Sequence, residues 1–569
     1  MEKRWNISDL KKGVQEISKI QEILKVDRVV ARLLYQRNLK EYDEIKTFFR
    51  PELNQLHDPF IMKGMSVAID RIDKAIANNE KILIYGDYDV DGTTAVSVVY
   101  RFFKAHTDQI AYYIPDRYGE GYGISFKGID FAKDNGFSLI IALDCGIKAI
   151  DKINYANELK VDFIICDHHL PGETIPEAIA VLDPKQHDCK YPYKELSGAG
   201  IGFKLIEAYS RKNNLDLQLC YNFLDLVVTS IAADIVPITG ENRVLAHFGL
   251  EKMNSNPRPG LKALLNMNQL AREITITNIV FVLSPRINAA GRIKQGSAAV
   301  ELLVCEDENE ANELAKGIND TNTQRKDLDL GTTTEAFALL ENDPITEFRK
   351  TTVLFSDKWH KGVVGIVASR LIEKYYKPTI VLTESDGKAT GSARSVRDYD
   401  IYSAIEKCSD LLEQFGGHKF AAGLTMKKEN VNDFIARFED VVSKSISDDQ
   451  LIPQLQIETE IEFHEITQKL VRILKQFSPH GPENMMPVFV SKNVFDNGWA
   501  KIVGANHLKL ELFQKSNPNI RFSAIAYDKG DYVKFFHDKT PMSIAFKIQE
   551  NEFNGKTSIQ LVIEDFKVS

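Results

Sequence analysis

The sequence predicts a multidomain α/β protein that opens with a parallel, doubly wound sheet and closes with a small β-barrel. Between residues 66 and 184, short apolar β-branched runs alternate with helical segments, which is the pattern of βαβ units. From residue 451 onward, short β-rich runs are separated by turn residues, and an OB-fold is the natural candidate for such a pattern. At 569 residues the chain is too long for one core, so we expect three or four domains.

The composition is that of an ordinary globular protein, with 44% hydrophobic and 27% charged residues. The first twelve residues, MEKRWNISDLKK, contain no apolar signal-peptide core. No apolar run approaches the ~20 residues that span a bilayer. Six scattered cysteines indicate reduced thiols, and we expect a cytoplasmic protein with no membrane partner. The net charge of −9 disfavours a nucleic-acid binder only weakly, because a basic groove can coexist with acidic surfaces.

The elements of the first half follow in order. Residues 1–60 are expected to form helical pieces, broken at Pro51, that cap the region after them. Helices are predicted at 66–79, 93–105, 126–135 and 149–160. Strands are predicted at 81–85, 109–115, 139–143, 161–166 and 178–184. The composition is then helical, through 198–210 and 222–237, to about residue 300.

The second half predicts a connector and two further domains. Residues 306–342 are polar with a sparse apolar stripe, which indicates a long, partly exposed helix or helix pair. A second α/β pattern begins at 351 and ends near 445, and 446–454 has the composition of a linker. We therefore expect five regions: 1–60, 61–240, 241–345, 346–450 and 451–569.

Acidic residues and histidines follow three of the predicted strands directly. Asp87, Asp89 and Asp91 lie in GDYDVDG after the first strand, Asp144 ends the third, and the triplet 167–169 (Asp-His-His) ends the fourth. The carboxyl ends of parallel strands form the ligand-binding edge of an open α/β sheet. Carboxylates grouped there without nearby Lys or Arg repel one another unless a cation lies among them. The pattern predicts a metal site, with more than one ion.

Each motif also has an alternative interpretation. GDYDVDG resembles a calcium loop, but it lacks a glutamate at the twelfth position and lies between a strand and a helix. Imidazole beside carboxylates favours Mn²⁺ over Mg²⁺, Fe²⁺ or Zn²⁺. Asp167 is either a ligand or an acceptor that holds a histidine ring in its ligating tautomer. Asp234, in the apolar segment SIAADIVP, is as readily structural as functional.

Together these elements resemble the DHH phosphoesterase superfamily. Asp89 and Asp91 match its first motif, Asp144 the second, the Asp-His-His triplet the third and Asp234 the fourth. The resemblance implies two Mn²⁺ or Mg²⁺ ions that share Asp144. One ion would be bound by Asp89, His168 and Asp144, and the other by Asp91, Asp144 and Asp234. His169 would contact the scissile phosphate or the leaving oxygen.

The first motif departs from the superfamily's pattern at one position. Its members often carry histidine four residues before the position of Asp89, where this chain has Tyr85. Asp87 is then the residue that would supply the missing ligand.

Four motifs in the second half bear on the substrate: SPRINAAGRI (284–293), WHKGVVGIVASRL (359–371), TGSARS (390–395) and GGHKFAAG (416–423). Small residues beside Arg, Ser and His let backbone N–H groups approach phosphates while arginine makes bidentate contacts. The alternative is that the glycines only make turns and that GVVGIVA is a packed helix. TGSAR and GGHKFAAG are similar to the DHHA1 substrate-binding domain of the same superfamily.

The order of a DHH domain, a helical connector, a smaller α/β DHHA1 domain and an OB-like barrel resembles bacterial exonucleases of this superfamily. The resemblance implies metal-dependent 5′→3′ hydrolysis of single-stranded DNA in repair and recombination. Arg117, Arg292 and Ser392 would receive the 5′-phosphate, with Arg394 and His418 on the neighbouring backbone; His360, in WHKG, is a further candidate. Trp499, Lys501, His507 and Lys509 would form part of a strand-binding surface on the barrel.

Rival functions stay open on the sequence alone. The nearest is a DHH phosphodiesterase that cleaves short oligonucleotides or cyclic dinucleotides; a DHH-like scaffold without metals and an inorganic pyrophosphatase are more distant. The long connector and the C-terminal β domain favour a polymeric substrate. The resemblance also suggests a monomer that works with a single-strand-binding protein and a helicase.

Overall fold

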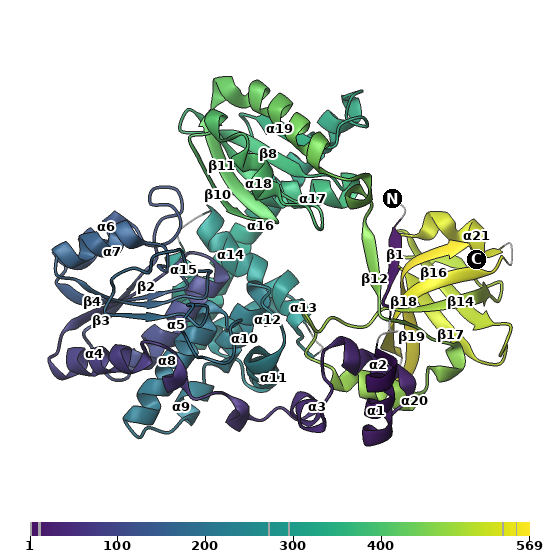
Figure 1. Cartoon of the computed structure of the whole chain (residues 1–569), viewed down its shortest axis with the longest axis horizontal. Helices are drawn as coiled ribbons and strands as arrows, with labels where there is room; N and C mark the ends of the chain where they lie inside the picture. Colours follow the sequence, from purple (N-terminus) through teal and green to yellow (C-terminus); the bar gives the residue numbers. More distant parts are fainter. Residues whose placement is uncertain are drawn as a thin grey trace. The chain divides into compact units, whose positions relative to one another are not determined.

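The computed structural model of the protein describes residues 3–9, 13–270, 273–293, 296–537, 540–553 and 555–568. The chain divides into two compact units, which we describe separately. The larger unit comprises Ile7–Gly291, Gln295–Ile318 and Gln456–Ser569, and the smaller unit comprises Met1–Asn6, Arg292–Lys294 and Asn319–Leu455. Figure 1 shows the course of the chain. In the part of the chain that the structure describes, no helix is long and apolar enough to cross a membrane.

A parallel sheet forms the centre of the first part of the larger unit. Its strands are β2 (Lys81–Gly86), β3 (Ile110–Tyr113), β4 (Phe137–Leu143), β5 (Asp162–Cys166) and β6 (Ala180–Leu182). They lie in the order β3-β2-β4-β5-β6, and every neighbouring pair is parallel. The winding direction reverses between β2 and β4, and open α/β sheets bind ligands at such a switch point.

Side chains of the strands alternate between two helical layers, because successive residues of a strand point to opposite faces. Ile82 and Ile84 pack in one core with α4 (Met65–Ala77), α5 (Val90–Lys104) and α8 (Gly198–Lys212). Leu83 and Tyr85 pack in the other with α6 (Phe126–Asp134) and α7 (Ile150–Glu158). Figure 1 shows the two layers on opposite faces of the sheet. The predicted parallel, doubly wound sheet is confirmed.

After the sheet, the described residues up to Asn342 form helices. They are α9 (Gln218–Tyr221), α10 (Leu224–Ala233), α11 (Gly240–Ser255), α12 (Pro259–Met267), α13 (Ile276–Asn278), α14 (Ser284–Ile293), α15 (Ser297–Val304) and α16 (Glu308–Asn342). A π-helical turn, Ile279–Leu283, precedes α14. The polar segment that the sequence left open as a helix or a helix pair is one helix of 35 residues.

The C-terminal part of the larger unit is a closed barrel. Its strands are β13 (Thr459–Glu460), β14 (Phe489–Asp496), β15 (Lys501–Val503), β16 (His507–Gln514), β17 (Arg521–Ala526), β18 (Met542–Phe553) and β19 (Lys556–Val568), with α20 (Gln468–Gln476) and α21 (Val533–His537). β14 pairs with β18 on one side and with β16 on the other, and this closes the sheet. The OB-like barrel that the sequence predicts is confirmed.

The N-terminal helices share the core of this barrel. They are α1 (Val14–Leu24), α2 (Arg28–Gln36) and α3 (Tyr42–Phe49). Leu33 and Phe48 belong to the same buried cluster as Phe463 and Phe477, and Phe48 meets Phe477 edge to face at 5.5 Å between ring centres. Helices expected as a cap on the segment that follows them thus pack on the C-terminal barrel.

The smaller unit is built on a mixed sheet of β7 (Thr352–Ser356), β8 (Thr379–Ser385), β9 (Lys388–Arg394), β10 (Gln414–His418) and β11 (Ala421–Lys427). The order is β10-β11-β9-β8-β7, and only the β7–β8 pair of this sheet is parallel. The unit also contains the part of α16 that begins at Asn319, and the helices α17 (Val364–Tyr375), α18 (Ile401–Glu406) and α19 (Val431–Ser445). The short strands β1 (Arg4–Ile7) and β12 (Gln454–Ile457) pair with each other.

Candidate metal centre

The loops after three adjacent strands bring the predicted acidic residues to one edge of the parallel sheet. GDYDVDG leads from β2 into α5, where Asp89 is the N-cap and its Oδ1 accepts the N–H of Gly92 at 3.0 Å. A Cβ on Gly92 would lie 2.4 Å from the carbonyl oxygen of Asp87, so only glycine fits this tight entry into the helix. Asp144 follows β4, and the Asp-His-His triplet follows β5.

Asp91 lies in the first turn of α5 and is held by the start of another helix. Its Oδ2 accepts the N–H of Gly198 at 2.7 Å, and its Oδ1 accepts the N–H of Ala199 at 2.9 Å. The hydroxyl of Ser230, on α10, donates to Oδ1 at 2.6 Å. The N-terminus of α8 thus fixes this carboxylate, because free N–H groups at a helix start favour negative charge.

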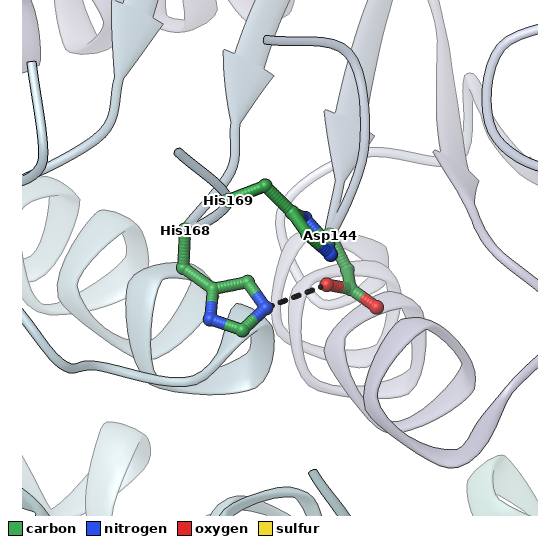
Figure 2. A group of neighbouring side chains, drawn as sticks. All are labelled: Asp144, His168 and His169. Carbon is green, nitrogen blue, oxygen red and sulfur yellow. Dashed lines mark ion pairs between the residues drawn. The ribbon is translucent and has the colours of Figure 1, made fainter. Parts of the chain in front are cut away.

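His168 lies at the centre of the acidic group. Its Nε2 is 3.1 Å from Asp144 Oδ1, 3.6 Å from Asp91 Oδ2 and 3.6 Å from Asp234 Oδ2. Figure 2 shows the ring directed at the carboxylate of Asp144. Asp144 itself has a left-handed backbone (φ 59°), a strained conformation of the kind found at functional sites. Asp234 is the C-cap of α10, and its side chain keeps 33% of its surface exposed at the rim.

Burial and the crowding of carboxyl groups raise the pKa values of three of these aspartates. Burial and the neighbouring Asp89 raise the pKa of Asp87 to about 8. Burial and the carboxylates of Asp91 and Asp89 raise the pKa of Asp144 well above its usual range. Partial burial, Asp91 and Asp89 raise the pKa of Asp234 to about 8. Ionised carboxylates in such a cluster require a compensating cation, and a divalent metal supplies that charge.

The residues present fit a divalent ion. Both ring nitrogens of His168, Oδ1 of Asp144 and Oδ2 of Asp87 are buried and have no hydrogen-bond partner among the described residues. Ligand atoms of Asp91, His168 and Asp234 lie within 4.8 Å of one another, as do those of Asp144, His168 and His169. Buried polar atoms without partners are costly, and oxygen and imidazole ligands suit Mn²⁺ or Mg²⁺.

Asp167 does not point at this group; it holds the adjacent histidine. Its Oδ1 is 2.7 Å from His169 Nδ1 and accepts the backbone N–H groups of both histidines, while Oδ2 accepts the N–H of Ile147 at 2.9 Å. Burial would raise the pKa of Asp167, but these hydrogen bonds hold it at about 2. Burial would lower the pKa of His169, but Asp167 raises it to about 9.

Tyr85 turns away from the metal-ligand group. Its hydroxyl donates to the carbonyl of Gly123 at 3.0 Å and accepts the N–H of Ser125 at 3.1 Å, and its ring stacks on Tyr113. Tyr85 therefore anchors the segment before α6. Asp87, two residues later, accepts the N–H of Gly123 with Oδ1 at 3.3 Å, while its Oδ2 has no hydrogen-bond partner among the described residues and is available as a ligand in place of histidine.

Arg117 lies in the loop that follows β3, with its guanidinium carbon 5.0 Å from the ring centre of Tyr88 in GDYDVDG. Tyr88 also meets the ring of Tyr122 at 6.1 Å. Arg117 is therefore held on the segment that carries Asp87 and Asp89.

Five other predicted substrate-binding residues gather in the smaller unit around the segment 362–365. Arg292 Nη1 donates to the carbonyl of Gly362 at 3.3 Å, and His360 Nδ1 accepts the N–H of Gly362 at 3.0 Å. Arg394 Nη1 donates to Ser392 Oγ at 2.7 Å. A Cβ on Gly365 would lie 3.0 Å from Arg394 Nη2 and 3.2 Å from Ser392 Oγ.

His418 completes this group. Burial and the nearby Arg394 lower its pKa, and its Nδ1 accepts the N–H of Phe420 at 3.2 Å. Two arginines, a hydroxyl and two imidazoles, from α14, β9, β10 and the segment before α17, form an arrangement suited to phosphate oxygens.

The barrel residues predicted to bind a strand lie on or beside the β15–β16 hairpin. Lys501 pairs with Lys509 across the two strands, and its ammonium is 5.8 Å from the ring centre of Trp499, which is 65% exposed. His507 contacts the ring of Tyr527 at 5.1 Å. Exposed aromatic rings beside lysines are the usual elements of a single-strand surface.

Several residues of the site do not stand out in the sequence. Ser230 and the Ser197–Ala199 turn bind Asp91, and Tyr122 contacts His169. The sequence SGAG at the start of a helical segment does indicate the turn, because serine is a common N-cap. It does not indicate the contact with Asp91, which lies 107 residues before Gly198 in the chain.

Three family models match the chain in the order of its domains. The model for the DHH family, N-terminal domain, matches residues 81–231, the DHHA1 domain residues 349–444 and the RecJ OB domain residues 457–565.

Relatives and solved structures agree with these matches. The chain is 36% identical to the single-stranded-DNA-specific exonuclease RecJ of Bacillus subtilis (strain 168), over 100% of this chain and 71% of that protein. It is 31% identical to the protein of the same name from Dickeya dadantii (strain 3937), over 94% of this chain and 95% of that protein. The structure of RecJ with Mn²⁺ from Thermus thermophilus superposes with a TM-score of 0.84 at 26% identity, over 100% of this chain and 80% of that one. A structure of exonuclease RecJ bound to manganese superposes with a TM-score of 0.60 at 30% identity, over 70% of this chain and 97% of that one. The chain belongs to the RecJ family.

Proposed function

We propose that this protein is a metal-dependent 5′→3′ exonuclease that hydrolyses the phosphodiester bonds of single-stranded DNA and serves repair and recombination. The observation that carries the proposal is the group formed by the buried residues Asp91, Asp144 and His168 with Asp234 at its rim, whose ligand atoms converge at a sheet edge. Two relatives that match 100% and 94% of this chain are named single-stranded-DNA-specific exonucleases.

The ligands proposed for two Mn²⁺ or Mg²⁺ ions are Asp87, Asp89, Asp91, Asp144, His168 and Asp234. Asp144 is proposed as the ligand that the two ions share, and its Oδ1 lies 3.1 Å from Nε2 of His168. The distances group His168 with Asp91 and Asp234 as well as with Asp144. When bound, a pair of such ions activates a water nucleophile and neutralises charge that develops on the phosphate.

The protein's own side chains would hold the substrate in place. His169, oriented by Asp167, faces the same group and would contact the scissile phosphate or the leaving oxygen. Arg117, Arg292 and Ser392 would receive the 5′-phosphate, and Arg394 and His418 would hold the neighbouring backbone. His360 is a further candidate for contacting the strand. Contacts to phosphates position a strand without reading its bases, so an anchored 5′ end determines polarity but not sequence.

The barrel would guide the rest of the strand. Trp499 is the proposed stacking platform, with Lys501, His507 and Lys509 as cationic neighbours. We further propose that the protein acts in the cytoplasm as a monomer, and that a helicase and a single-strand-binding protein present the strand to it.

The end-labelling experiment tests this function. A 5′-phosphorylated single strand, labelled at its 5′ or at its 3′ end, is incubated with protein and Mn²⁺. A 5′→3′ exonuclease releases labelled mononucleotide at once from the 5′-labelled strand, and the 3′-labelled strand shortens gradually. A preference for oligonucleotides of a few residues, or for cyclic dinucleotides, would instead indicate the alternative DHH phosphodiesterase. No cleavage at all would refute the proposal.

Asp144→Ala tests the shared ligand. The substitution should abolish hydrolysis while DNA binding, measured by fluorescence anisotropy, largely persists. Asp134→Ala, an exposed aspartate at the end of α6, serves as the control and should keep the wild-type rate. A wild-type rate in Asp144→Ala would show that this residue is not a shared metal ligand.

A further inference from the structure

Tyr122 lies beside the metal-ligand group, on a loop whose backbone favours glycine on either side of the tyrosine. Gly121 has φ 89° and Gly123 has φ 77°, both in the left-handed region, so the chain turns sharply on either side of the tyrosine. The Tyr122 residue is 56% exposed, so its ring is not part of the core. Its hydroxyl is nonetheless 3.3 Å from Nε2 of His169, and the two rings meet edge to face at 6.2 Å between centres.

This contact completes a chain of three side chains. Asp167 Oδ1 is 2.7 Å from His169 Nδ1, and Tyr122 lies at the opposite nitrogen. The imidazole is therefore held at both ring nitrogens. A hydroxyl is well suited to this place, because it donates to a neutral imidazole nitrogen and accepts from a protonated one.

The loop around Tyr122 is fastened to the segment that carries the metal ligands. The N–H of Gly123 donates to Asp87 Oδ1 at 3.3 Å, and the carbonyl of Gly123 accepts the Tyr85 hydroxyl at 3.0 Å. The Tyr122 ring also contacts Tyr88, which stands between Asp87 and Asp89. The contacts of Gly123 and of the Tyr122 ring thus set the placement of the phenol relative to His169.

We propose that Tyr122 is a positioning residue for hydrolysis, which clamps the His169 ring from the side opposite to Asp167 so that it faces the phosphate at the metal centre. The inference rests on the proposed function, because the position of His169 matters for catalysis only if phosphodiester bonds are cleaved at this site. Partners that orient residues around a metal site commonly change activity by about 10–100-fold when they are removed.

Tyr122→Phe removes the hydroxyl and keeps the ring. We expect kcat on a 5′-phosphorylated single strand to fall by about 10-fold or more, with KM and the Kd for Mn²⁺, measured by calorimetry, unchanged. Tyr42→Phe is the matched control, since Tyr42 is 54% exposed on α3, and it should keep the wild-type kcat. A wild-type kcat in Tyr122→Phe would overturn the proposal.

A double substitution separates positioning from a general structural effect. Because Tyr122 acts through His169, Tyr122→Phe should cost little further activity in a His169→Gln background. An equal loss in both backgrounds would show that Tyr122 acts by another route.

A spectroscopic readout covers the case in which His169→Gln is too slow to measure. The imidazole ¹⁵N resonances of His169, assigned by their loss in His169→Gln, should shift in Tyr122→Phe without metal or DNA. Unchanged resonances would overturn the contact itself.

The activity of the wild-type protein tests the proposed function separately from the role of Tyr122. If the wild type releases no mononucleotide, the proposed function fails. If it does release mononucleotide and Tyr122→Phe matches it, only the role of Tyr122 fails.

Discussion

The N–H of Gly198 donates to Asp91 Oδ2 at 2.7 Å, and the same glycine packs against Asp144. A Cβ built on Gly198 would lie 2.7 Å from the Cβ of Asp144 and 3.0 Å from its Cγ. One residue at the start of α8 therefore contacts two of the proposed metal ligands. The N–H groups at the start of α8 place partial positive charge beside the carboxylate of Asp91. The absence of a side chain on Gly198 leaves room for Asp144.

Gly198→Ala should therefore damage the metal centre directly. The added methyl group cannot be accommodated without moving Asp144, which is attached to a buried strand and has no space to yield. We expect hydrolysis to fall by at least about 10-fold and the Kd for Mn²⁺ to rise, as when the support of a metal ligand is disturbed. Steady-state kinetics and calorimetric Mn²⁺ titration measure the two effects.

Gly331→Ala is the control, since its added Cβ, on the exposed side of α16, would have no described atom within 4 Å apart from its chain neighbours and the adjacent backbone of the same helix. Alanine there should leave activity unchanged and stabilise the helix by about 0.5–1 kcal/mol. Equal hydrolysis rates and equal Mn²⁺ affinities in Gly198→Ala and Gly331→Ala would contradict the role of Gly198 in the metal centre.

Much of this centre could be predicted because its residues follow strands. The runs before Asp87, Asp144 and Asp167 are apolar and β-branched, and parallel strands end at a common edge. The contact between Gly198 and Asp91 could not be predicted, because it joins the start of α8 to the first turn of α5, and the two residues are 107 positions apart in the sequence. Local patterns carry no information on such pairs.

Tyr85 illustrates the same limit at a single residue. The sequence marks it as the residue in place of a histidine, but does not show where its hydroxyl points. The structure places that hydroxyl on Gly123 and Ser125, away from the carboxylates.

Tyr85→Phe should consequently cost stability rather than metal affinity. It leaves the carbonyl of Gly123 and the N–H of Ser125 without this buried partner, which should lower the free energy of unfolding by about 1–3 kcal/mol. The Kd for Mn²⁺ should match that of the wild type. Urea denaturation and calorimetry test these expectations, with Tyr155→Phe as a control that removes a single hydrogen bond, to the side chain of Asp130. A large rise in Kd would place Tyr85 among the metal ligands after all.

The fold shows a second limit of sequence reasoning. Helices α1–α3 have buried stripes, but nothing in their sequence identifies the barrel as their partner. A side chain far from both in the sequence, Arg243 on α11, joins them. It donates to the carbonyls of Phe48, Gln476, Phe477, Ser478 and Pro479, and its guanidinium carbon lies 3.7 Å from the ring centre of Phe48.

Arg243→Met should loosen this junction. Methionine has a similar length but donates no hydrogen bond, so buried carbonyl oxygens lose their charged donor. We expect a loss of at least about 3 kcal/mol and a lower unfolding temperature by calorimetry. Arg472→Met, an exposed arginine on α20, should leave the unfolding temperature unchanged. Equal stability of the two variants would show that the Arg243 contacts contribute nothing net.

His480, in the loop that Arg243 contacts, should make the stability of the protein depend on pH. Burial lowers the pKa of His480 to about 4, helped by the charges of Arg37 and Arg243, although the carbonyl of Asn484 accepts from its ring. An unfolded chain has the ordinary histidine pKa of about 6.5. Below that pH the unfolded state binds a proton that the folded state does not, so this contribution is full above pH ~6.5 and is lost as the pH falls.

The free energy of unfolding should accordingly drop by about 3 kcal/mol from this residue as the pH falls from about 6.5 to about 4. His480→Asn keeps an N–H donor near the Asn484 carbonyl but cannot titrate, so its stability should fall less over the same range. The difference between the urea midpoints of wild type and variant, measured at several pH values, isolates His480 from the other titrating groups. Parallel pH profiles would contradict the prediction, because they would mean that His480 takes up its proton equally well in the folded chain.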